Sequence, residues 1–396
     1  PQGGIDLVES AAAPGKVPFA YALDGSVLLA GSVDAVKLAI ARGPANALAA
    51  DADFKAAQSS LGGDALGSVY LDVKGYVALV SQAETGALSK LGTGTGTGGM
   101  QLTRPAIPPI DTSLLPGWVA LRVQADSDHL VFDEAQPTVA GQPAQASRTS
   151  AIAAELPAGT LAQVELHDVG SVAQRALSQL EKQPGGPTAA QVDGIFKYVG
   201  GVDKALGWLG DADVAVLHDG SGFSGGIVAQ TTDATASTNL FTELRNLASL
   251  GGSTAGIAIR TESYDGQTIT VVSPASAGAT STPRVELAFS QANDLVIVGV
   301  GDAFVKAVLD TKAGHSLADQ PAYQQAIGLA GSSNAGQGFI DLAGLRADIE
   351  ALATKSSRLA DYDANIKPFL EPFTSLAWSN SAGSDLSTTR VVLVLK

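Results

Sequence analysis

Apolar and polar residues alternate with a period of two in several short runs of the chain. From Leu161 to His167, the apolar residues Ala162, Val164 and Leu166 alternate with polar ones. This period is typical of a β-strand whose two sides meet different surroundings. A second segment, from Asp213 to Gln230, has two strand-like runs around a glycine-rich centre and predicts a hairpin.

Two Asp-Gly pairs, Asp24-Gly25 and Asp265-Gly266, lie between strand-like runs and predict tight hairpin turns. A type I′ turn needs positive φ at both central positions, which aspartate and glycine tolerate. Strands joined by such turns are antiparallel. Helix-like segments come in separate groups, so we expect an α+β fold of antiparallel sheet packed with helices and not an alternating βαβ series.

Short helices are predicted after two of the strands. Gly31 and Gly299 each end a strand-like run, and Asp34 and Asp302 follow three residues later. An aspartate at the start of a helix can accept hydrogen bonds from free backbone N–H groups. We therefore expect Asp34 and Asp302 to cap these helices.

The same order of residues occurs twice in the chain, at an offset of 268 to 269 positions. Residues 27–31 correspond to 295–299, and residues 70–72 correspond to 339–341. Self-similarity over this length indicates two homologous structural units.

The predicted units are residues 1–147 and 148–396. Residues 151–262 have no counterpart ahead of Pro1, so we expect the first unit to be truncated at its N-terminus. It carries a Gly/Thr/Pro-rich insertion at 92–109. Since the chain does not start with methionine, we expect an upstream signal, anchor or domain segment.

Composition and charge exclude several classes of protein. With 45% apolar and 16% charged residues, the chain is too hydrophobic for general disorder. Lys+Arg 24 and Asp+Glu 39 give 24 − 39 = −15, which supplies no basic surface for nucleic acid or an anionic membrane. The absence of cysteine excludes disulfides, thiolate metal sites and cysteine nucleophiles. Apolar runs are strand-sized, so we expect membrane contact only through a missing N-terminal anchor.

Three segments carry a resemblance to a known family: residues 155–166, the strand-to-helix step at 295–308, and residues 372–377. Together they resemble an uncharacterised bacterial family, mainly actinobacterial, catalogued as domain-of-unknown-function family 3352. The resemblance covers the second unit nearly end to end and the first in part. It implies an exported, membrane-anchored envelope protein, and it supplies no activity, cofactor or functional residue.

Ser224 lies in a G-x-S-x-G sequence, the pattern of a serine nucleophile between a strand and a helix. His315 further along the chain permits the order Ser, Asp, His. A strand-like run, 226–230, follows Ser224 where a helix is required. The pattern therefore favours a glycine-rich turn over a nucleophile.

His167-Asp168 and His218-Asp219 each end a predicted strand. If the two strands were neighbours, their imidazoles and carboxylates could converge on a metal ion, which needs three or four such ligands. The alternative is that these are solvent-facing strand ends that lead into turns.

Three further patterns carry weak signals. Residues 126–129, with Asp133 and Glu134, offer oxygen atoms for calcium, but they lack the glycine and the terminal glutamate of a calcium loop, which favours a solvated hairpin tip. Residues 94–99 resemble a phosphate-binding loop that is followed by prolines where a helix is needed. Trp118, Trp208 and Trp378, with Phe196 and Tyr198, could line an apolar ligand cleft, but core packing is the favoured explanation.

Because no acid, base, nucleophile or metal set converges, we interpret the chain as a non-catalytic binding or scaffolding module of the bacterial cell envelope, outside the cytoplasm. One alternative is a carrier of a hydrophobic ligand or lipid in a cavity between sheet and helices. Another is a hydrolase that uses Ser224 or the His167/His218 pair. No cofactor is expected, and the expected partner is an envelope protein, polymer or lipid, not nucleic acid.

Overall fold

The structure is a computed structural model that describes residues 5–10, 18–25, 27–42, 47–81, 112–139, 144–182, 188–218, 222–255, 257–274, 285–353 and 359–396. The predicted insertion at 92–109 and Asp219 lie outside these residues.

Strands make up the larger part of the ordered elements. They are β1 (Leu7–Glu9), β2 (Phe19–Asp24), β3 (Val27–Ser32), β4 (Gly67–Asp72), β5 (Trp118–Ala125), β6 (His129–Pro137), β7 (Thr160–Leu166), β8 (Leu209–His218), β9 (Phe223–Thr231), β10 (Ile257–Tyr264), β11 (Gln267–Pro274), β12 (Leu287–Ala292), β13 (Leu295–Val300), β14 (Gly336–Asp341), β15 (Phe373–Ala382) and β16 (Leu386–Leu395).

Helices connect the strands in groups. The α-helices are α1 (Val33–Ala41), α2 (Ala52–Leu61), α4 (Val169–Lys182), α5 (Ala189–Phe196), α6 (Val202–Leu206), α7 (Ala234–Ala255), α8 (Asp302–Leu309), α9 (Pro321–Ala330), α10 (Leu342–Ala353), α11 (Leu359–Asn365) and α12 (Lys367–Leu370). The 3-10 helices are η2 (Leu48–Ala50), η3 (Thr112–Leu114), η4 (Ile152–Ala154), η5 (Lys197–Val199) and η6 (Leu317–Asp319).

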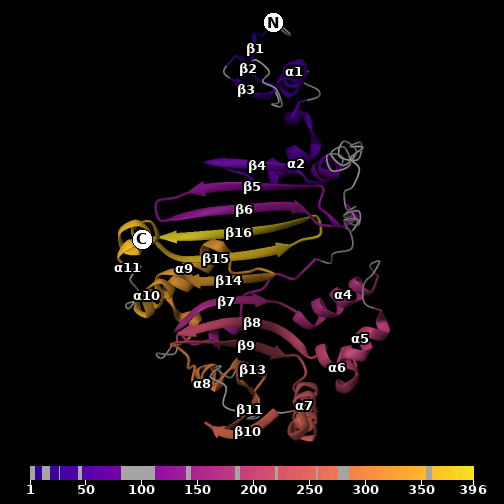
Figure 1. Ribbon diagram of the computed structural model, residues 1–396, viewed down its shortest axis with the longest axis vertical. Helices are drawn as coiled ribbons and strands as arrows, with labels where there is room; N and C mark the ends of the chain where they lie inside the picture. The colour runs from indigo at the N-terminus through magenta and orange to yellow at the C-terminus, as the bar shows by residue number, and fades with distance from the viewer. Residues whose placement is uncertain are drawn as a thin grey trace, which may run out of the picture. The chain divides into compact units, whose positions relative to one another are not determined.

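Two sheets hold the strands (Figure 1). The smaller has the order β1-β2-β3, and the larger has the order β10-β11-β12-β13-β9-β8-β7-β14-β15-β16-β6-β5-β4. Neighbours such as β7 and β8, β14 and β15, or β16 and β6 pair antiparallel. The protein is therefore α+β with an antiparallel sheet, as the sequence predicts.

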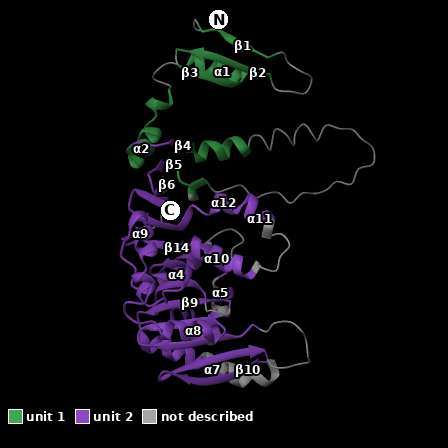
Figure 2. Cartoon of the chain, turned by 90° about the vertical axis from the view of Figure 1, so that its left-hand side faces the viewer, with its two compact units in different colours: residues 1–63, 70–120 green, residues 64–69, 121–396 purple. Residues whose placement is uncertain are grey.

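Contacts divide the chain into two compact units, coloured separately in Figure 2. The first comprises residues 1–63 and 70–120, and the second comprises 64–69 and 121–396. Strand β6 falls in the second unit because it pairs along its length with β16. The division into 1–147 and 148–396 stays a prediction from the sequence repeat.

Element order is the same in the two predicted repeats. In the first, the hairpin β2–β3 is followed by α1, η2, α2 and β4, and in the second the hairpin β12–β13 is followed by α8, η6, α9 and β14. This order agrees with the sequence repeat. That the two units are homologous stays a prediction.

The predicted turn at Asp265-Gly266 is confirmed. Tyr264 pairs with Gln267, and both turn residues have positive φ, 46° and 78°. The other predicted turn differs, because Asp24 is itself the last paired residue of β2, opposite Val27, and among residues 24 and 25 it is Gly25 that has positive φ, 59°.

The predicted helix caps are wrong by one or two positions. Ser32 is the N-cap of α1, where its hydroxyl accepts a hydrogen bond from the backbone N–H of Ala35 at 3.3 Å. Asp34 lies inside the first turn, where a carboxylate complements the positive end of the helix dipole. Likewise, Gly301 is the N-cap of α8, and Asp302 instead binds Lys306 at 2.6 Å.

One side of the large sheet, here the covered face, carries the main hydrophobic core (Figure 1). Helix α8 packs on β9, β12 and β13, and α9 packs on β14, β15 and β16. Phe304 of α8 is fully buried against Gly226 and Gly299, which are opposed on β9 and β13. A Cβ at Gly226 would lie 2.5 Å from the Phe304 ring, so glycine is required for this close approach.

The opposite side of the sheet, from β6 to β9, is here the open face. Helix α7 covers the next part of that side, where Phe241 packs against Phe289 of β12 with ring centroids 5.1 Å apart. None of the helices among the described residues is long and apolar enough to span a bilayer.

Candidate functional site

A row of directly opposed polar residues crosses six strands on the covered face. Directly opposed residues of paired antiparallel strands point to the same side of a sheet. We call this set the polar row, and it consists of Asp213, Glu165, Gln337, Ser379, Arg390 and Asp133. Two residues further along the strands, the same side carries the buried apolar residues Ala215, Phe339 and Ala377.

One residue further along each strand, the open face carries an apolar row. It consists of Ile227, Val214, Val164, Gly338, Trp378, Val391 and Phe132. Seven strands at a spacing of ~4.8 Å give this row a length of about 29 Å. At this position along the strands, the polar row therefore lies on the covered face and the apolar row lies on the open face.

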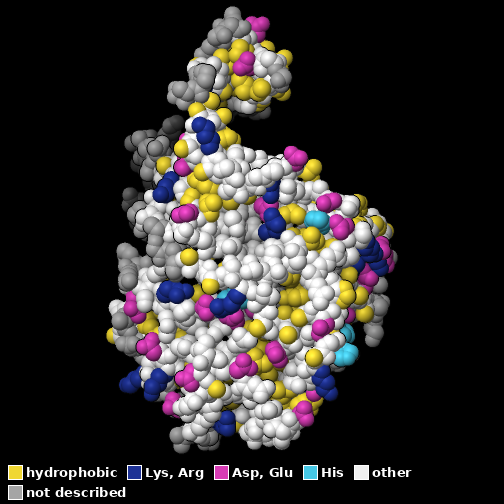
Figure 3. All heavy atoms as spheres, turned by 180° about the vertical axis from the view of Figure 1, so that it is seen from behind, with side chains coloured by type: hydrophobic (Ala, Val, Ile, Leu, Met, Phe, Trp, Pro, Cys, Tyr) yellow, Lys and Arg dark blue, Asp and Glu magenta, His cyan; other side chains and the backbone are white. Residues whose placement is uncertain are grey.

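Several side chains of the apolar row are substantially exposed. The exposed fraction is 54% for Val214, 44% for Ile227, 40% for Phe132 and 39% for Val164. Figure 3 shows apolar side chains gathered in several patches on the face of the molecule that it views. Neighbouring exposed apolar residues of this kind mark interaction surfaces more often than isolated ones do.

At one end of the polar row, Asp133 binds two arginines. Its carboxylate accepts hydrogen bonds from Arg122 Nη2 at 2.5 Å and from Arg390 Nε at 2.7 Å. Burial alone would raise the pKa of Asp133, but the hydrogen bonds from both guanidinium groups outweigh it and lower the pKa. Asp133 is therefore an ionised, fully partnered carboxylate.

Asp211 lies beside the other end of the row, on β8, and accepts several hydrogen bonds. The donors are His167 Nδ1 at 2.9 Å, Arg148 Nε at 3.0 Å, Arg148 Nη2, and the backbone N–H of Asp168 at 3.0 Å. Burial opposes ionisation, but these donors hold the pKa of Asp211 well below its ordinary value. Both carboxylate oxygens of Asp211 are thus in use.

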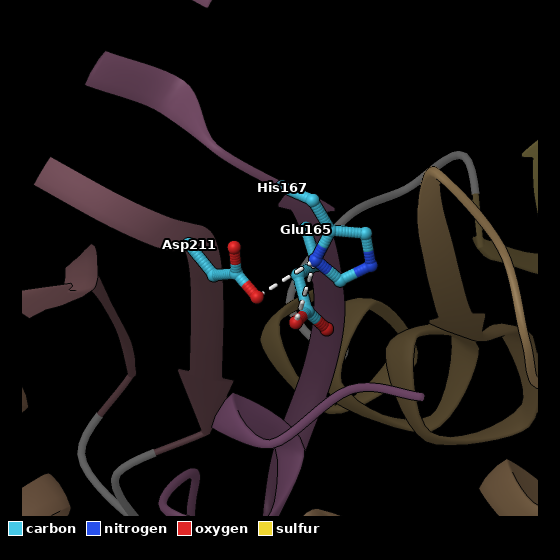
Figure 4. A group of neighbouring side chains, drawn as sticks. All are labelled: Glu165, His167 and Asp211. Carbon is cyan, nitrogen blue, oxygen red and sulfur yellow. Dashed lines mark hydrogen bonds and ion pairs between the residues drawn. The ribbon is translucent and has the colours of Figure 1, made fainter. Parts of the chain in front are cut away.

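Glu165 lies on β7 and His167 directly follows this strand. Both side chains point toward Asp211 (Figure 4). His167 Nδ1 lies 3.8 Å from Glu165 Oε1. Burial lowers the pKa of His167, but the hydrogen bond to Asp211 and the charges of Asp211 and Glu165 more than offset it, so the pKa is raised. The three side chains offer ligand atoms within 4.8 Å of one another, the spacing of a metal site.

Glu165 and Asp213 form the centre of the site. Both residues are fully buried, and they are directly opposed on β7 and β8. Glu165 Oε2 accepts a hydrogen bond from Gln337 Nε2 at 3.3 Å, whereas Glu165 Oε1 and both oxygens of Asp213 have no hydrogen-bond partner among the described residues. Burial and the Glu165 charge raise the pKa of Asp213 to about 8.

Polar residues next to this pair form a connected set. Gln337 Nε2 also donates to Tyr323 Oη at 2.7 Å, and Asn334 Nδ2 donates to Gln337 Oε1 at 2.9 Å. Gln163 lies two residues before Glu165 on the same side of β7. It is 1% exposed, and neither amide atom has a partner among the described residues. Oxygen atoms that lack partners in a buried place require an explanation such as a bound proton, water or ion.

The structure does not bring the two predicted His-Asp pairs together. Strands β7 and β8 are neighbours, but antiparallel pairing places His167 near Asp211 and His218 beyond Leu217, which pairs with Thr160. Seven residues of strand separate the two ends, which is about 23 Å. His218 is 44% exposed and lies 2.9 Å from Asp348.

Of the expected solvent-facing residues at the end of β7, one is buried and one is exposed. His167 is 4% exposed and does not face solvent, because Asp211 holds it on the covered side. Asp168 does lie outside, with its carboxylate 3.0 Å from Arg148.

Ser224 lies inside β9 and is 7% exposed. Its Oγ has no hydrogen-bond partner among the described residues, so no described histidine activates it. The predicted glycine-rich turn at this position is wrong, since the strand begins at Phe223. The exposed residue His315 lies between α8 and η6, where its carbonyl accepts a hydrogen bond from the backbone N–H of Ala158 at 3.1 Å.

The described residues of the three weaker sequence patterns do not form a common site either. Asp128 and His129 lie at the tip between β5 and β6, where the carboxylate is 2.7 Å from the imidazole. Trp118 and Trp208 are 3% and 5% exposed, whereas the ring of Trp378 lies over Gly338 on the open face. Residues 94–99 lie outside the described residues.

A hollow of about 340 Å³ lies beside α4. Amide and hydroxyl side chains form most of its lining, among them Gln136, Gln145 and Thr388. This lining differs from the apolar cavity that the carrier hypothesis predicts.

Sequence reasoning missed Glu165, Gln163, Asp211 and Asp213. The signal available was a set of polar residues two apart on predicted neighbouring strands, at 163, 165 and 167 and at 211 and 213. Alternation alone does not say which side of a strand is buried.

Comparison with known proteins gives a family and no activity. No curated protein matches the chain. A solved structure titled "Structure of crystal form III of TP0453" is similar at 9% sequence identity and a TM-score of 0.29, over 61% of this chain and 91% of that one. Residues 118–396, well over half of the chain, match the family described as "Protein of unknown function (DUF3352)". The chain belongs to this family.

Proposed function

We propose that the chain is a non-catalytic binding module that holds a partner protein on the open face of its sheet. The observation that supports this most directly is the apolar row, in which Val164, Val214 and Ile227 lie side by side on three paired strands and are all substantially exposed. An antiparallel sheet normally turns its apolar side toward its own helices. Here α8 and α9 pack on the side of the polar row instead, and α10 reaches the apolar side at the end of β8, where Asp348 binds His218. The exposed middle of the apolar side is the surface that we assign to another molecule.

The dimensions and charge favour a protein as the partner. The apolar row extends for about 29 Å across flat, paired strands, whereas small ligands bind in concave pockets. The net charge of −15 disfavours the anionic surface of a membrane. The partner we propose has an apolar, uncharged surface that can lie across several strands.

The arrangement of the polar groups supports the non-catalytic part of the proposal. Asp211 has both oxygens engaged, Ser224 Oγ has no described base, and His218 lies on the exposed end of β8 with Asp348. A general base must be within hydrogen-bond reach of the group that it activates. The envelope location implied by the sequence resemblance stays a prediction.

Site-specific photo-crosslinking in the source cells tests this proposal. Val214→p-benzoylphenylalanine places the probe on the open face, and Leu352→p-benzoylphenylalanine on α10, with 65% exposure, is the matched control. We expect one protein to be captured from position 214 and not from 352. The purified pair should then bind in calorimetry, and Val214→Asp should weaken the affinity at least about tenfold, because a charge is forced into an apolar contact.

Three results would contradict the proposal. The first is cross-linking at position 214 only to lipid, and the second is cross-linking only to another copy of the same chain. The third is equal affinity of the purified partner for the wild type and Val214→Asp.

A further inference from the structure

Three oxygen atoms of two directly opposed residues on the covered face have no hydrogen-bond partner within the described part of the chain. They are Glu165 Oε1 and the two carboxylate oxygens of Asp213. Directly opposed side chains on antiparallel strands have Cβ atoms about 5 Å apart, so the two carboxylates face each other across β7 and β8. Two carboxylates in this arrangement repel each other unless a positive species lies between them.

Gln163 adds an independent observation. Its side chain is on the same side of β7 as Glu165, and it lies diagonally across from Asp213, because Gln163 pairs with Ala215. On the other side, Gln163 is opposed by Phe339, which has no polar group. The polar neighbours of the buried amide on these strands are thus Glu165, Asp213 and, diagonally on β14, Gln337. Neither amide atom of Gln163 has a hydrogen-bond partner among the described residues.

When all of the carboxylates are ionised, which for Asp213 means above its raised pKa of about 8, the charges around the pair do not balance. Three buried carboxylates, those of Glu165, Asp211 and Asp213, then share two cations, His167 and Arg148. Arg148 is also shared with the exposed carboxylate of Asp168. Both cations contact Asp211, which leaves Asp213 without a cationic partner among the described residues.

We propose that Glu165, Asp213 and Gln163 form a binding site for a divalent cation of the oxygen-preferring class, with Ca²⁺ as the preferred ion. Together they offer four oxygens that accept no hydrogen bond from the described residues, two from Asp213 and one each from Glu165 and Gln163, and Glu165 Oε1 also lies 3.8 Å from His167 Nδ1. Carboxylate and amide oxygens are the ligands of Ca²⁺, which accepts irregular geometry, whereas Mg²⁺ usually keeps several waters. A buried site therefore suits Ca²⁺ better than Mg²⁺.

This site differs from the group of Glu165, His167 and Asp211. Asp211 already accepts hydrogen bonds at both oxygens, and His167 Nδ1 donates one of them, so neither residue has a free ligand atom facing the group. We assign these two residues, with Arg148, to a neighbouring ion-pair network that leaves Glu165 Oε1 available.

Calorimetric titration of the full chain with CaCl₂ after removal of metals by EDTA tests the proposal. Because the site is buried, the protein is also unfolded in urea and refolded with and without Ca²⁺ before thermal unfolding. We expect one Ca²⁺ per chain and a higher melting temperature with Ca²⁺. We expect Asp213→Asn and Glu165→Gln to lose binding by at least about tenfold, whereas Asp168→Asn, which changes an exposed nearby carboxylate, keeps it.

Gln163→Met is the variant that tests the site with least risk to folding, because it keeps the length of the side chain and removes only the amide. Circular dichroism checks that each variant is folded. Weaker Ca²⁺ binding by folded Gln163→Met supports the proposal. Two results would overturn it: no binding and no thermal shift in the wild type with Ca²⁺, Mg²⁺ or Mn²⁺, which would indicate a shared proton, or unchanged binding in Asp213→Asn.

Discussion

Glu165 and Asp213 are fully buried carboxylates that lie directly opposite each other on β7 and β8. A buried charge without a partner opposes folding, whereas a neutral side chain of the same shape does not. When both are ionised, the pair therefore lowers stability unless a positive species is bound between them.

In EDTA at pH 9, above the raised pKa of Asp213 of about 8, we expect Asp213→Asn to raise the free energy of unfolding by about 1–3 kcal/mol, because the amide removes the repulsion from Glu165. Urea unfolding monitored by circular dichroism measures the change. Asp294→Asn, at the exposed turn between β12 and β13, is the control and should change little. A lower stability of Asp213→Asn in EDTA would show that the ionised carboxylate is already compensated within the chain.

The stability that Asp133 contributes depends on pH. Its pKa is lowered in the folded protein by Arg390 and Arg122. A lowered pKa means that the stabilisation is complete above the unfolded value of ~3.9 and is lost as pH falls through the folded value. We therefore expect Asp133→Asn to cost about 1–3 kcal/mol at pH 7 and progressively less below pH ~4. Urea unfolding of both proteins at several pH values checks this, and a cost that is the same at every pH would contradict it.

Phe304 and the two glycines beneath it anchor α8 to the sheet. We expect Phe304→Ala to cost about 3–5 kcal/mol, because the cavity it leaves is surrounded by rigid strands. Gly226→Ala should also destabilise strongly, since its Cβ would lie 2.2 Å from the carbonyl oxygen of Val298. Gly328→Ala is the matched control, as it lies in α9 with open space around the new methyl group and should stabilise by about 0.5–1 kcal/mol. Similar melting temperatures for Gly226→Ala and Gly328→Ala would refute this packing.

The exposed apolar row should bind the dye ANS in the native protein, since ANS fluoresces on exposed apolar surface. We expect the combined variant Val164→Thr, Val214→Thr and Ile227→Thr to lose about half of that fluorescence or more. Its stability should change little, because threonine suits strands as well as valine does. Leu352→Gln controls for an exposed apolar side chain on α10, and an equal loss of fluorescence in that variant would argue against the row as the binding surface.

The turn at Asp265 was predictable because the signal is local: two residues need positive φ, and Asp-Gly supplies them. At Asp24 the same signal was displaced by one residue, since the strand pairing of Asp24 with Val27 overrides the local preference. The predicted helix cap at Asp34 was also displaced, because α1 begins at Val33 and Ser32 directly precedes it.

The candidate site was harder to predict because it depends on which side of β7 is buried. The alternation of Val164 and Glu165 predicts a strand, but the usual assumption would bury Val164. In the structure Glu165 is buried and Val164 is 39% exposed. Which side of β7 is buried depends on where α8 and α9 pack and on the register of β8. Both are non-local, so the sequence of β7 alone does not determine the buried side.

Trp378 lies over Gly338 in the middle of the open face, while Trp118 and Trp208 are buried, and these are the three tryptophans of the chain. An indole at this position serves as a built-in optical reporter. Acrylamide added to the free protein will quench mainly the emission of Trp378, and any molecule that seats on the sheet will shield this one ring and shift its spectrum to the blue. Occupancy of the surface can thus be followed without a label, even before the identity of the occupant is known.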